Sequence, residues 1–200
     1  MAAAIGALVT WQLRPGDATT APSAIRFSVA ADLSGIFNRP IAVSPDGRRV
    51  VFTNQTEPGL KVRALDELEP RGISGTAGVR DLAVSPDSQH VAFWIADQIK
   101  RVPITGGAVV SVGAAPGRPY GISWAGDGFI YYGRGAEGIW RIPESGGKTE
   151  LVKAMKPGQY AHGPQLLAGG SWLIYTRASR VTGWNDASID RKSTRLNSSH

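Results

Sequence analysis

One serine of the chain lies in a pattern close to that of a catalytic nucleophile. The segment Gly121-Ile-Ser123-Trp-Ala125 differs only at its last position from Gly-x-Ser-x-Gly, the turn that exposes the nucleophilic serine of many hydrolases. That turn joins a strand to a helix, whereas Ala125 is followed by a Gly/Asp turn and a second run of strand formers. A triad also needs a base and an orienting acid, and we recognise no such set. We therefore interpret Ser123 as structural and expect this chain not to be an enzyme.

Three aspartates recur at regular intervals and could bind a metal ion together. Asp46, Asp87 and Asp127 are about 40 residues apart, and carboxylates gathered by a repeat could bind Ca²⁺. Each of them lies in a turn, however, where aspartate commonly hydrogen-bonds the backbone, and the EF-hand spacing is absent. His90 and His162 have no third partner at the spacing of a zinc site, and the chain has no cysteine. We expect neither a metal nor another cofactor.

Each of these aspartates follows a short apolar strand, and a second apolar strand comes directly after it. Ser-Pro-Asp-Gly suits a type I turn, because proline presets φ, serine can hydrogen-bond the turn, and glycine tolerates positive φ at the exit. The turn residues are Ser44, Pro45, Asp46 and Gly47 in the first copy, Ser85, Pro86 and Asp87 in the second, and Asp127 and Gly128 in the third; residues 164–175 are a degenerate fourth copy. We place Ser123 at the repeat position of Ser44 and Ser85, beside the turn.

A second hairpin follows the first in each unit. Its first strand is predicted at 60–65, 99–104 and 139–143, and short outer strands are predicted at 71–73, 109–112 and 150–152. Four strands in about 40 residues are typical of one β-propeller blade. The sequence therefore predicts an all-β fold, an incomplete β-propeller of about three and a half four-stranded blades. Trp124, Trp140 and Trp172 occupy strand positions and are expected in the core between blades.

The predicted blades cover residues 36–75, 76–114, 115–155 and 158–190, within a propeller domain of residues 25–190. A lone strand at 25–29 precedes the first blade, and such a strand often completes the last blade of a closed ring. The apolar alternation stops after Ile189, so we interpret residues 191–200 as a non-native tail and the fourth blade as cut. Since propellers have about 4–8 blades, we expect an arc rather than a closed ring.

A short apolar segment, residues 1–13, begins the chain. It is shorter than the roughly 20 residues that span a bilayer, and it lacks the basic residues that open a signal peptide. Three interpretations stay open: the end of a truncated transmembrane helix, which we favour, a degenerate signal sequence, and a plain apolar terminus. Residues 14–24 follow as a Pro/Thr/Ala linker without periodicity.

The formal net charge of +6 is not evidence for a nucleic-acid partner. Arg191, Lys192 and Arg195 lie in the tail, which contains no acidic residue, so half of the excess charge is confined there. The rest is spread along the chain without a definable basic face, whereas nucleic-acid binding needs a clustered one. We therefore expect no nucleic-acid partner.

Residues that could contact a ligand precede two of the predicted inner strands. Arg118 and Tyr120 precede the inner strand of the third blade, and Tyr160 and His162 precede that of the fourth. Both pairs are therefore expected on loops at the same end of the propeller channel. Arginine, tyrosine and histidine at a channel mouth could bind a protein or a small molecule, although ordinary polar loop residues would give the same pattern.

The Ser-Pro-Asp-Gly turn, the strand Val50-Val-Phe52 and the Gly-Gly turns resemble the WD40-like repeats of TolB-type proteins. Over residues 5–190, the order of features resembles the C-terminal half of bacterial membrane-anchored serine/threonine protein kinases: an apolar segment, a linker, Arg26-Phe-Ser-Val29, and Ile139-Trp-Arg-Ile-Pro143. This resemblance implies a non-catalytic sensor or protein-interaction domain, extracytoplasmic (periplasmic) and held at the membrane through residues 1–13. The chain itself contains no kinase motif. Two alternatives stay open, a free TolB-like periplasmic scaffold protein and the propeller of a prolyl-oligopeptidase-type serine peptidase.

Overall fold

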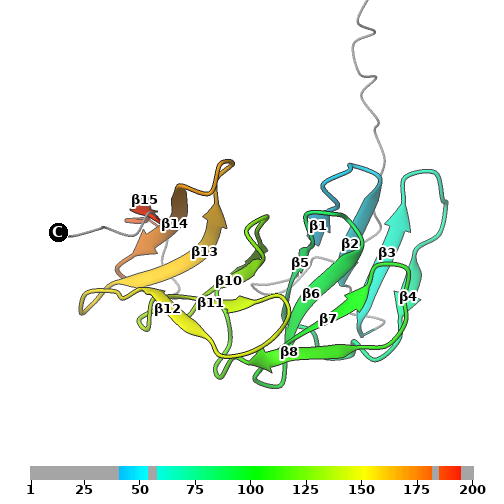
Figure 1. Cartoon of the computed structure of the whole chain (residues 1–200), viewed down its shortest axis with the longest axis horizontal. Coiled ribbons are helices and arrows are strands. Elements are labelled where there is room, and N and C mark those ends of the chain that lie inside the picture. Colours follow the sequence, from blue (N-terminus) through cyan, green and yellow to red (C-terminus); the bar gives the residue numbers. More distant parts are fainter. Residues whose placement is uncertain (1–40, 54–57, 182–184, 195–200) are drawn as a thin grey trace, which may run out of the picture.

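The computed structural model describes residues 41–53, 58–181 and 185–194 (Figure 1). The predicted apolar segment 1–13, the linker 14–24 and the lone strand 25–29 lie outside the described residues, as do residues 195–200 of the predicted tail. Within the described part the chain forms four antiparallel sheets and no helix. The predicted all-β fold, an incomplete β-propeller, is confirmed.

Each sheet is one blade, built as a simple meander in which neighbouring strands follow one another in the sequence. Blade 1 contains β1 (Ile41–Val43), β2 (Arg49–Thr53), β3 (Leu60–Ala64) and β4 (Arg71–Ile73). Blade 2 contains β5 (Asp81–Val84), β6 (His90–Ile95), β7 (Gln98–Pro103) and β8 (Val110–Ala114). Blade 3 contains β9 (Ile122–Trp124), β10 (Phe129–Gly133), β11 (Ile139–Pro143) and β12 (Glu150–Lys153). Blade 4 contains β13 (Tyr160–Leu166), β14 (Trp172–Ala178) and β15 (Ser188–Ser193).

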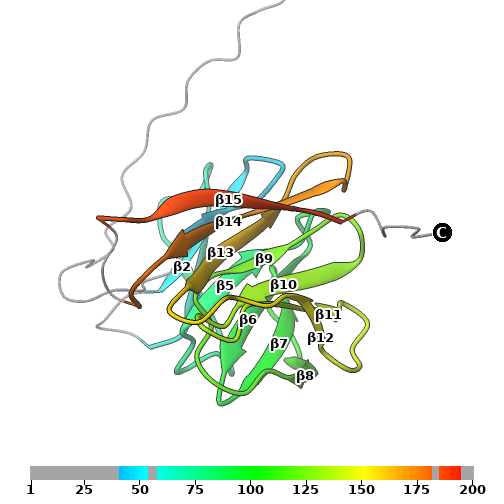
Figure 2. The same cartoon turned by 90° about the vertical axis from the view of Figure 1, so that its left-hand side faces the viewer.

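The fourth blade extends a little further than the sequence pattern indicates. Strand β15 pairs with β14 along its whole length, from Arg177↔Ser188 to Trp172↔Ser193. It therefore continues three residues beyond 190, where the predicted blade ends. Figure 2 shows β15 as the outer strand of this blade, next to β14.

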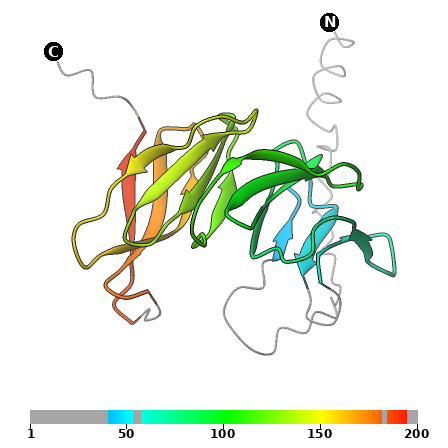
Figure 3. The same cartoon turned by 90° about the horizontal axis from the view of Figure 1, so that it is seen from below.

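The blades follow one another around an arc (Figures 1 and 3). Apolar side chains fill the space between neighbouring blades. One cluster lies between blades 1 and 2 and includes Phe93. A second lies between blades 2 and 3 and includes Tyr132, and a third lies between blades 3 and 4 and includes Tyr175. Burial of these strand residues supplies most of the favourable free energy of such a fold, and it depends on each blade having a neighbour.

The tryptophans differ in how far they join this core. Trp124 and Trp140 pack, partly buried, against the second cluster, as the sequence predicts. The prediction is wrong for Trp172, which is 41% exposed and lies under the guanidinium of Arg191. Successive side chains of a strand point to opposite faces, and the neighbouring Leu173 is the one that packs toward blade 3.

The inner strands of the blades run in the same direction. The backbone N–H of Asp46 donates to Ser88 Oγ, which joins the aspartate turns of blades 1 and 2. The backbone N–H of Gly121 donates to Asp81 Oδ2, which joins the starts of β5 and β9. We call the end where the inner strands begin the mouth, and the end with the aspartate turns the turn end. Between them lies a channel cavity of about 290 Å³, lined by residues of β1, β5, β9 and β13.

Candidate functional site

The segment that carries Arg118 and Tyr120 is held at the mouth by three blades. The Tyr120 N–H donates to the Gly133 carbonyl oxygen of its own blade at 2.9 Å. The Tyr120 carbonyl accepts a 2.6 Å hydrogen bond from the N–H of Gly163 in blade 4. The N–H of Gly121 donates to Asp81 of blade 2 at 2.9 Å. Tyr120 therefore occupies a loop whose backbone is fixed on both sides.

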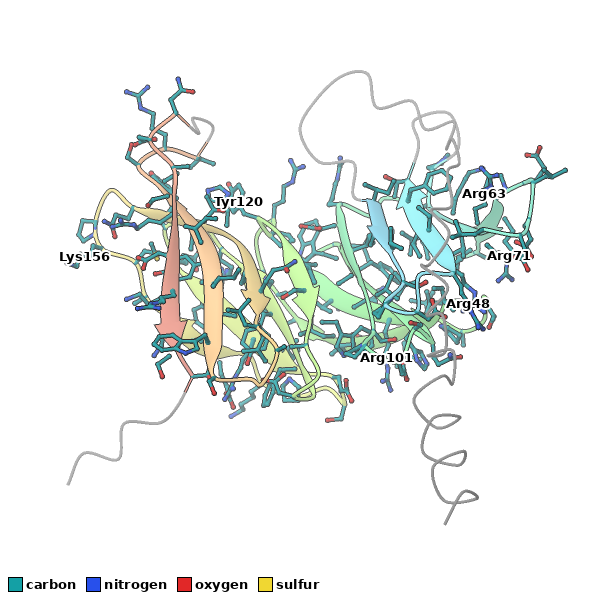
Figure 4. All side chains as sticks on the ribbon, turned by 90° about the horizontal axis from the view of Figure 1, so that it is seen from above. Arg48, Arg63, Arg71, Arg101, Tyr120 and Lys156 are labelled. Atoms are coloured by element: carbon teal, nitrogen blue, oxygen red, sulfur yellow. The ribbon has the colours of Figure 1, made fainter. Side chains whose placement is uncertain are left out.

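Aromatic side chains gather at this point between blades 3 and 4. The Tyr120 ring meets the His162 ring edge to face, with 4.8 Å between the ring centroids. A β-carbon on Gly135 would lie 3.1 Å from Tyr120 Cε2 and 3.5 Å from Tyr160 Cδ1. Both tyrosines thus border the same small space, which glycine keeps open. Figure 4 shows Tyr120 on the half of the molecule that blades 3 and 4 form.

The structure places the four predicted contact residues at one end of the molecule but not all on loops. Arg118 is exposed and Tyr120 is partly buried, and both precede β9 in a loop. Tyr160 and His162 lie inside β13, so the loop prediction is wrong for them. Strand β13 starts early because its pairing with β14 shifts between His162 and Gln165, which lets the strand continue past the bend.

His162 is only 5% exposed, and burial lowers its pKa. Its imidazole packs against the Tyr120 ring and is shielded from solvent. Tyr120 and Tyr160 are partly buried and Arg118 is exposed. Arg118, Tyr120 and Tyr160 therefore form the solvent-accessible part of the site, and His162 holds the Tyr120 ring in place.

Asp81 belongs to the same site, although the sequence pattern did not single it out. Its Oδ1 accepts the N–H of Leu82 and its Oδ2 accepts the N–H of Gly121, each at 2.9 Å. Burial raises the pKa of this carboxyl to about 6, while these two hydrogen bonds and the charge of Arg118 act in the opposite direction. A signal was present: Asp81 is a charged residue directly before an apolar inner strand.

The predicted turn residues lie at the opposite end of the blades and satisfy one another. Ser44 Oγ donates to Asp46 Oδ1 at 2.5 Å and accepts the N–H of Arg49, while the N–H of Gly47 donates to the Ser44 carbonyl. Ser85 and Asp87 repeat this arrangement in blade 2. The prolines Pro45 and Pro86 occupy the second turn position. These contacts hold each aspartate in its own turn.

The third turn is built differently, and it corrects the position given to Ser123. The N–H of Ala125 donates to the Phe129 carbonyl, four residues later, where the N–H groups of Ser44 and Ser85 donate to carbonyls five residues later. Ala125, two residues before the turn aspartate, therefore occupies their repeat position. Asp127 accepts the Tyr131 hydroxyl at 2.7 Å in place of a serine, and Gly128 follows it with positive φ. Ser123 lies two residues earlier, in β9 opposite Tyr131.

The described part of the chain contains neither an activated serine nor a metal-ligand group. There, Ser123 Oγ is buried and has no hydrogen-bond partner, so no base activates it. The same residues contain no group of three His, Asp or Glu side chains that could hold a metal ion. Nor do they form a helix long and apolar enough to cross a membrane.

Comparison with known proteins supports the fold through similar structures and finds no relative by sequence. No family model matches the chain, and no curated protein matches it. Among solved structures, a putative TolB from Agrobacterium tumefaciens is similar with a TM-score of 0.64 and 18% identity, over 76% of this chain and 60% of that one. The chain has the fold of a TolB-like β-propeller. A nidogen/laminin complex (TM-score 0.59, 16% identity, 70% of this chain and 60% of that one) is also similar.

A third similar structure is an oligogalacturonate lyase in complex with manganese. Its TM-score is 0.57 and its identity 15%, over 77% of this chain and 50% of that one. The chain thus spans between half and three fifths of the length of these structures. At such identities the likeness concerns the fold.

Proposed function

We propose that this chain is a non-catalytic binding domain that contacts a protein or a small-molecule ligand at its mouth. The observation that carries the proposal is the fixed contact between Tyr120 and His162, beside Tyr160 and the exposed Arg118. Tyrosine and arginine are enriched where proteins bind partners. A surface already held in place loses little conformational entropy on binding, and the backbone bonds on both sides of Tyr120 provide that order.

Two of the similar structures illustrate the choice between binding and catalysis. Nidogen is described in a complex with laminin, which supports a protein partner for a propeller of this shape. The oligogalacturonate lyase is an enzyme in complex with manganese. The described residues of the present chain hold neither a three-ligand metal group nor an activated serine, which favours binding.

We further propose that the domain is the extracytoplasmic part of a membrane-anchored bacterial serine/threonine protein kinase. The support is the order of its features, an apolar segment at 1–13, a linker and propeller repeats. A free periplasmic scaffold protein is the second candidate, and the likeness to TolB favours it. In both cases the propeller binds a ligand or partner, and any catalysis belongs to another domain or another protein.

The coding sequence on both sides of this segment tests the parent protein. Upstream kinase motifs, a Gly-rich loop, His-Arg-Asp and Asp-Phe-Gly, are expected. A cleavable signal followed by a lone propeller would favour the scaffold instead. A downstream Gly-x-Ser-x-Gly in a hydrolase domain would contradict both and assign the chain to a serine peptidase.

A further inference from the structure

Both oxygens of the Asp81 carboxylate are engaged by backbone amides. Oδ1 accepts the N–H of Leu82 and Oδ2 accepts the N–H of Gly121, 40 residues later. The first bond fixes the carboxylate at the start of β5, and the second reaches the next blade. Hydrogen bonds to an ionised acceptor are about twice as strong as neutral ones. Ionised Asp81 therefore clamps the end of the loop that carries Tyr120.

The position of Gly121 determines where the aromatic rings of Tyr120 and His162 meet. Gly121 has a φ of +93°, and a β-carbon there would lie 2.6 Å from the Cα of Gly163. Its neighbour Tyr120 accepts the N–H of Gly163 and touches the ring of His162. A shift of Gly121 would therefore move the contact between blades 3 and 4.

One charged group acts on the Asp81 carboxylate among the described residues. It is the guanidinium of Arg118, which lies three residues before Gly121 in the same loop and favours the ionised carboxylate. The exposed Arg118 is also a proposed contact residue. The carboxylate thus influences two contact residues, Arg118 by charge and Tyr120 through the backbone.

We propose that Asp81 is a positioning residue of the mouth: its carboxylate orders the loop of Arg118 and Tyr120, and protonation weakens its hold on Gly121. A proton on either oxygen weakens one of the two amide bonds and removes the charge that attracts Arg118. Burial raises the pKa of this carboxyl to about 6. The inference rests on the proposed function only in treating the mouth as the binding surface.

The test follows the Gly121 amide by NMR in the full 200-residue chain labelled with ¹⁵N, between pH 5 and pH 7.5. The amide signal is expected to shift with one inflection near pH 6, and its hydrogen exchange, corrected for the intrinsic pH dependence, to be at least several-fold faster on the acid side. The variant Asp81→Asn should show no inflection. Because no ligand is used, the outcome is independent of whether the mouth binds one.

Asp97, in the turn between β6 and β7, offers a matched control because it also bonds the loop of Arg118 and Tyr120. Its Oδ1 accepts the N–H of Gly117 at 2.9 Å, but the residue is exposed. Asp97→Asn should keep the Gly121 inflection, and so should a variant that removes the nearby histidine, His162→Gln. A Gly121 signal that does not titrate near pH 6, or that still titrates in Asp81→Asn, would overturn the proposal.

Discussion

Gly121 and Gly163 meet backbone to backbone at the junction of blades 3 and 4, so closely that a β-carbon on Gly121 would lie 2.6 Å from the Cα of Gly163. The contact has no counterpart in local turn chemistry, because it joins residues of different blades. It explains why a glycine with positive φ precedes β9 at this point. It also brings Tyr120 against the ring of His162.

Gly121→Ala should destabilise the fold by about 2–4 kcal/mol, since the methyl group would overlap backbone and the residue would keep a left-handed φ. The measurement is the urea midpoint of unfolding, followed by tyrosine and tryptophan fluorescence. Gly72→Ala is the control, because nothing lies within 4 Å of a β-carbon there and its φ is ordinary. Equal effects of both substitutions would contradict the close contact.

Asp81→Asn should raise stability at pH 7.5 by about 1–2 kcal/mol if the amide oxygen keeps the Gly121 bond. The pKa of Asp81 is about 6 in the fold against 3.8 ordinarily, so the folded state binds the proton more tightly. Its contribution to stability is therefore complete below pH 3.8 and is lost as the pH rises through 6.

Urea unfolding at pH 4 and pH 7.5 checks this expectation, with Asp97→Asn as the control that should gain nothing. A variant less stable than the wild type at pH 7.5 would show that the two amide bonds outweigh the cost of burying the charge. Protonation of Asp81 thus removes the cost of burying its charge and weakens its bond to Gly121. Unfolding measures the first effect, and exchange of the Gly121 amide measures the second.

Ser85→Ala should cost about 1–3 kcal/mol, because it removes a buried hydroxyl that serves a donor and an acceptor. Its Oγ donates to Asp87 at 2.5 Å and accepts the N–H of His90 at 2.8 Å. The same hydroxyl lowers the pKa of Asp87, so part of the loss should vanish in strong acid. Ser111→Ala, at an exposed residue with a long 3.3 Å bond, should change stability little, and a comparable loss there would argue against the turn's importance.

The blades could be predicted from the sequence because their signals are local. The turn at Asp46 needs only serine, proline and glycine within a few residues, and the strands around it are runs of apolar side chains. The third turn is present at the predicted Asp127 and Gly128, but its serine position was misplaced, since the Tyr131 hydroxyl replaces a serine from within the following strand. That is why Ser123 was assigned the place that Ala125 holds.

Part of the candidate site could also be predicted, because the repeat gives local signals. Their shared position in the repeat predicts that Tyr120 and His162 lie at one end of the blades. The burial of His162 in β13, against Tyr120 of the neighbouring blade, has no such local signal. The place of Asp81 before an apolar strand is a sequence signal, but it does not reveal what the carboxylate contacts. Its role comes from a hydrogen bond between blades and from burial, both of which exist only after the blades pack.

The mouth as binding surface is tested most directly by site-specific photo-cross-linking in the cells that carry this gene. A photoreactive residue is placed at the exposed Arg118, and, as the control, at the exposed Arg48 of the turn end. Tyr120 and Arg48 lie on opposite halves of the molecule in Figure 4. We expect a discrete adduct from position 118 that weakens when Tyr120→Ala is added, and none from position 48. Adducts from position 48 alone, or adducts from 118 that ignore Tyr120→Ala, would contradict binding at the mouth.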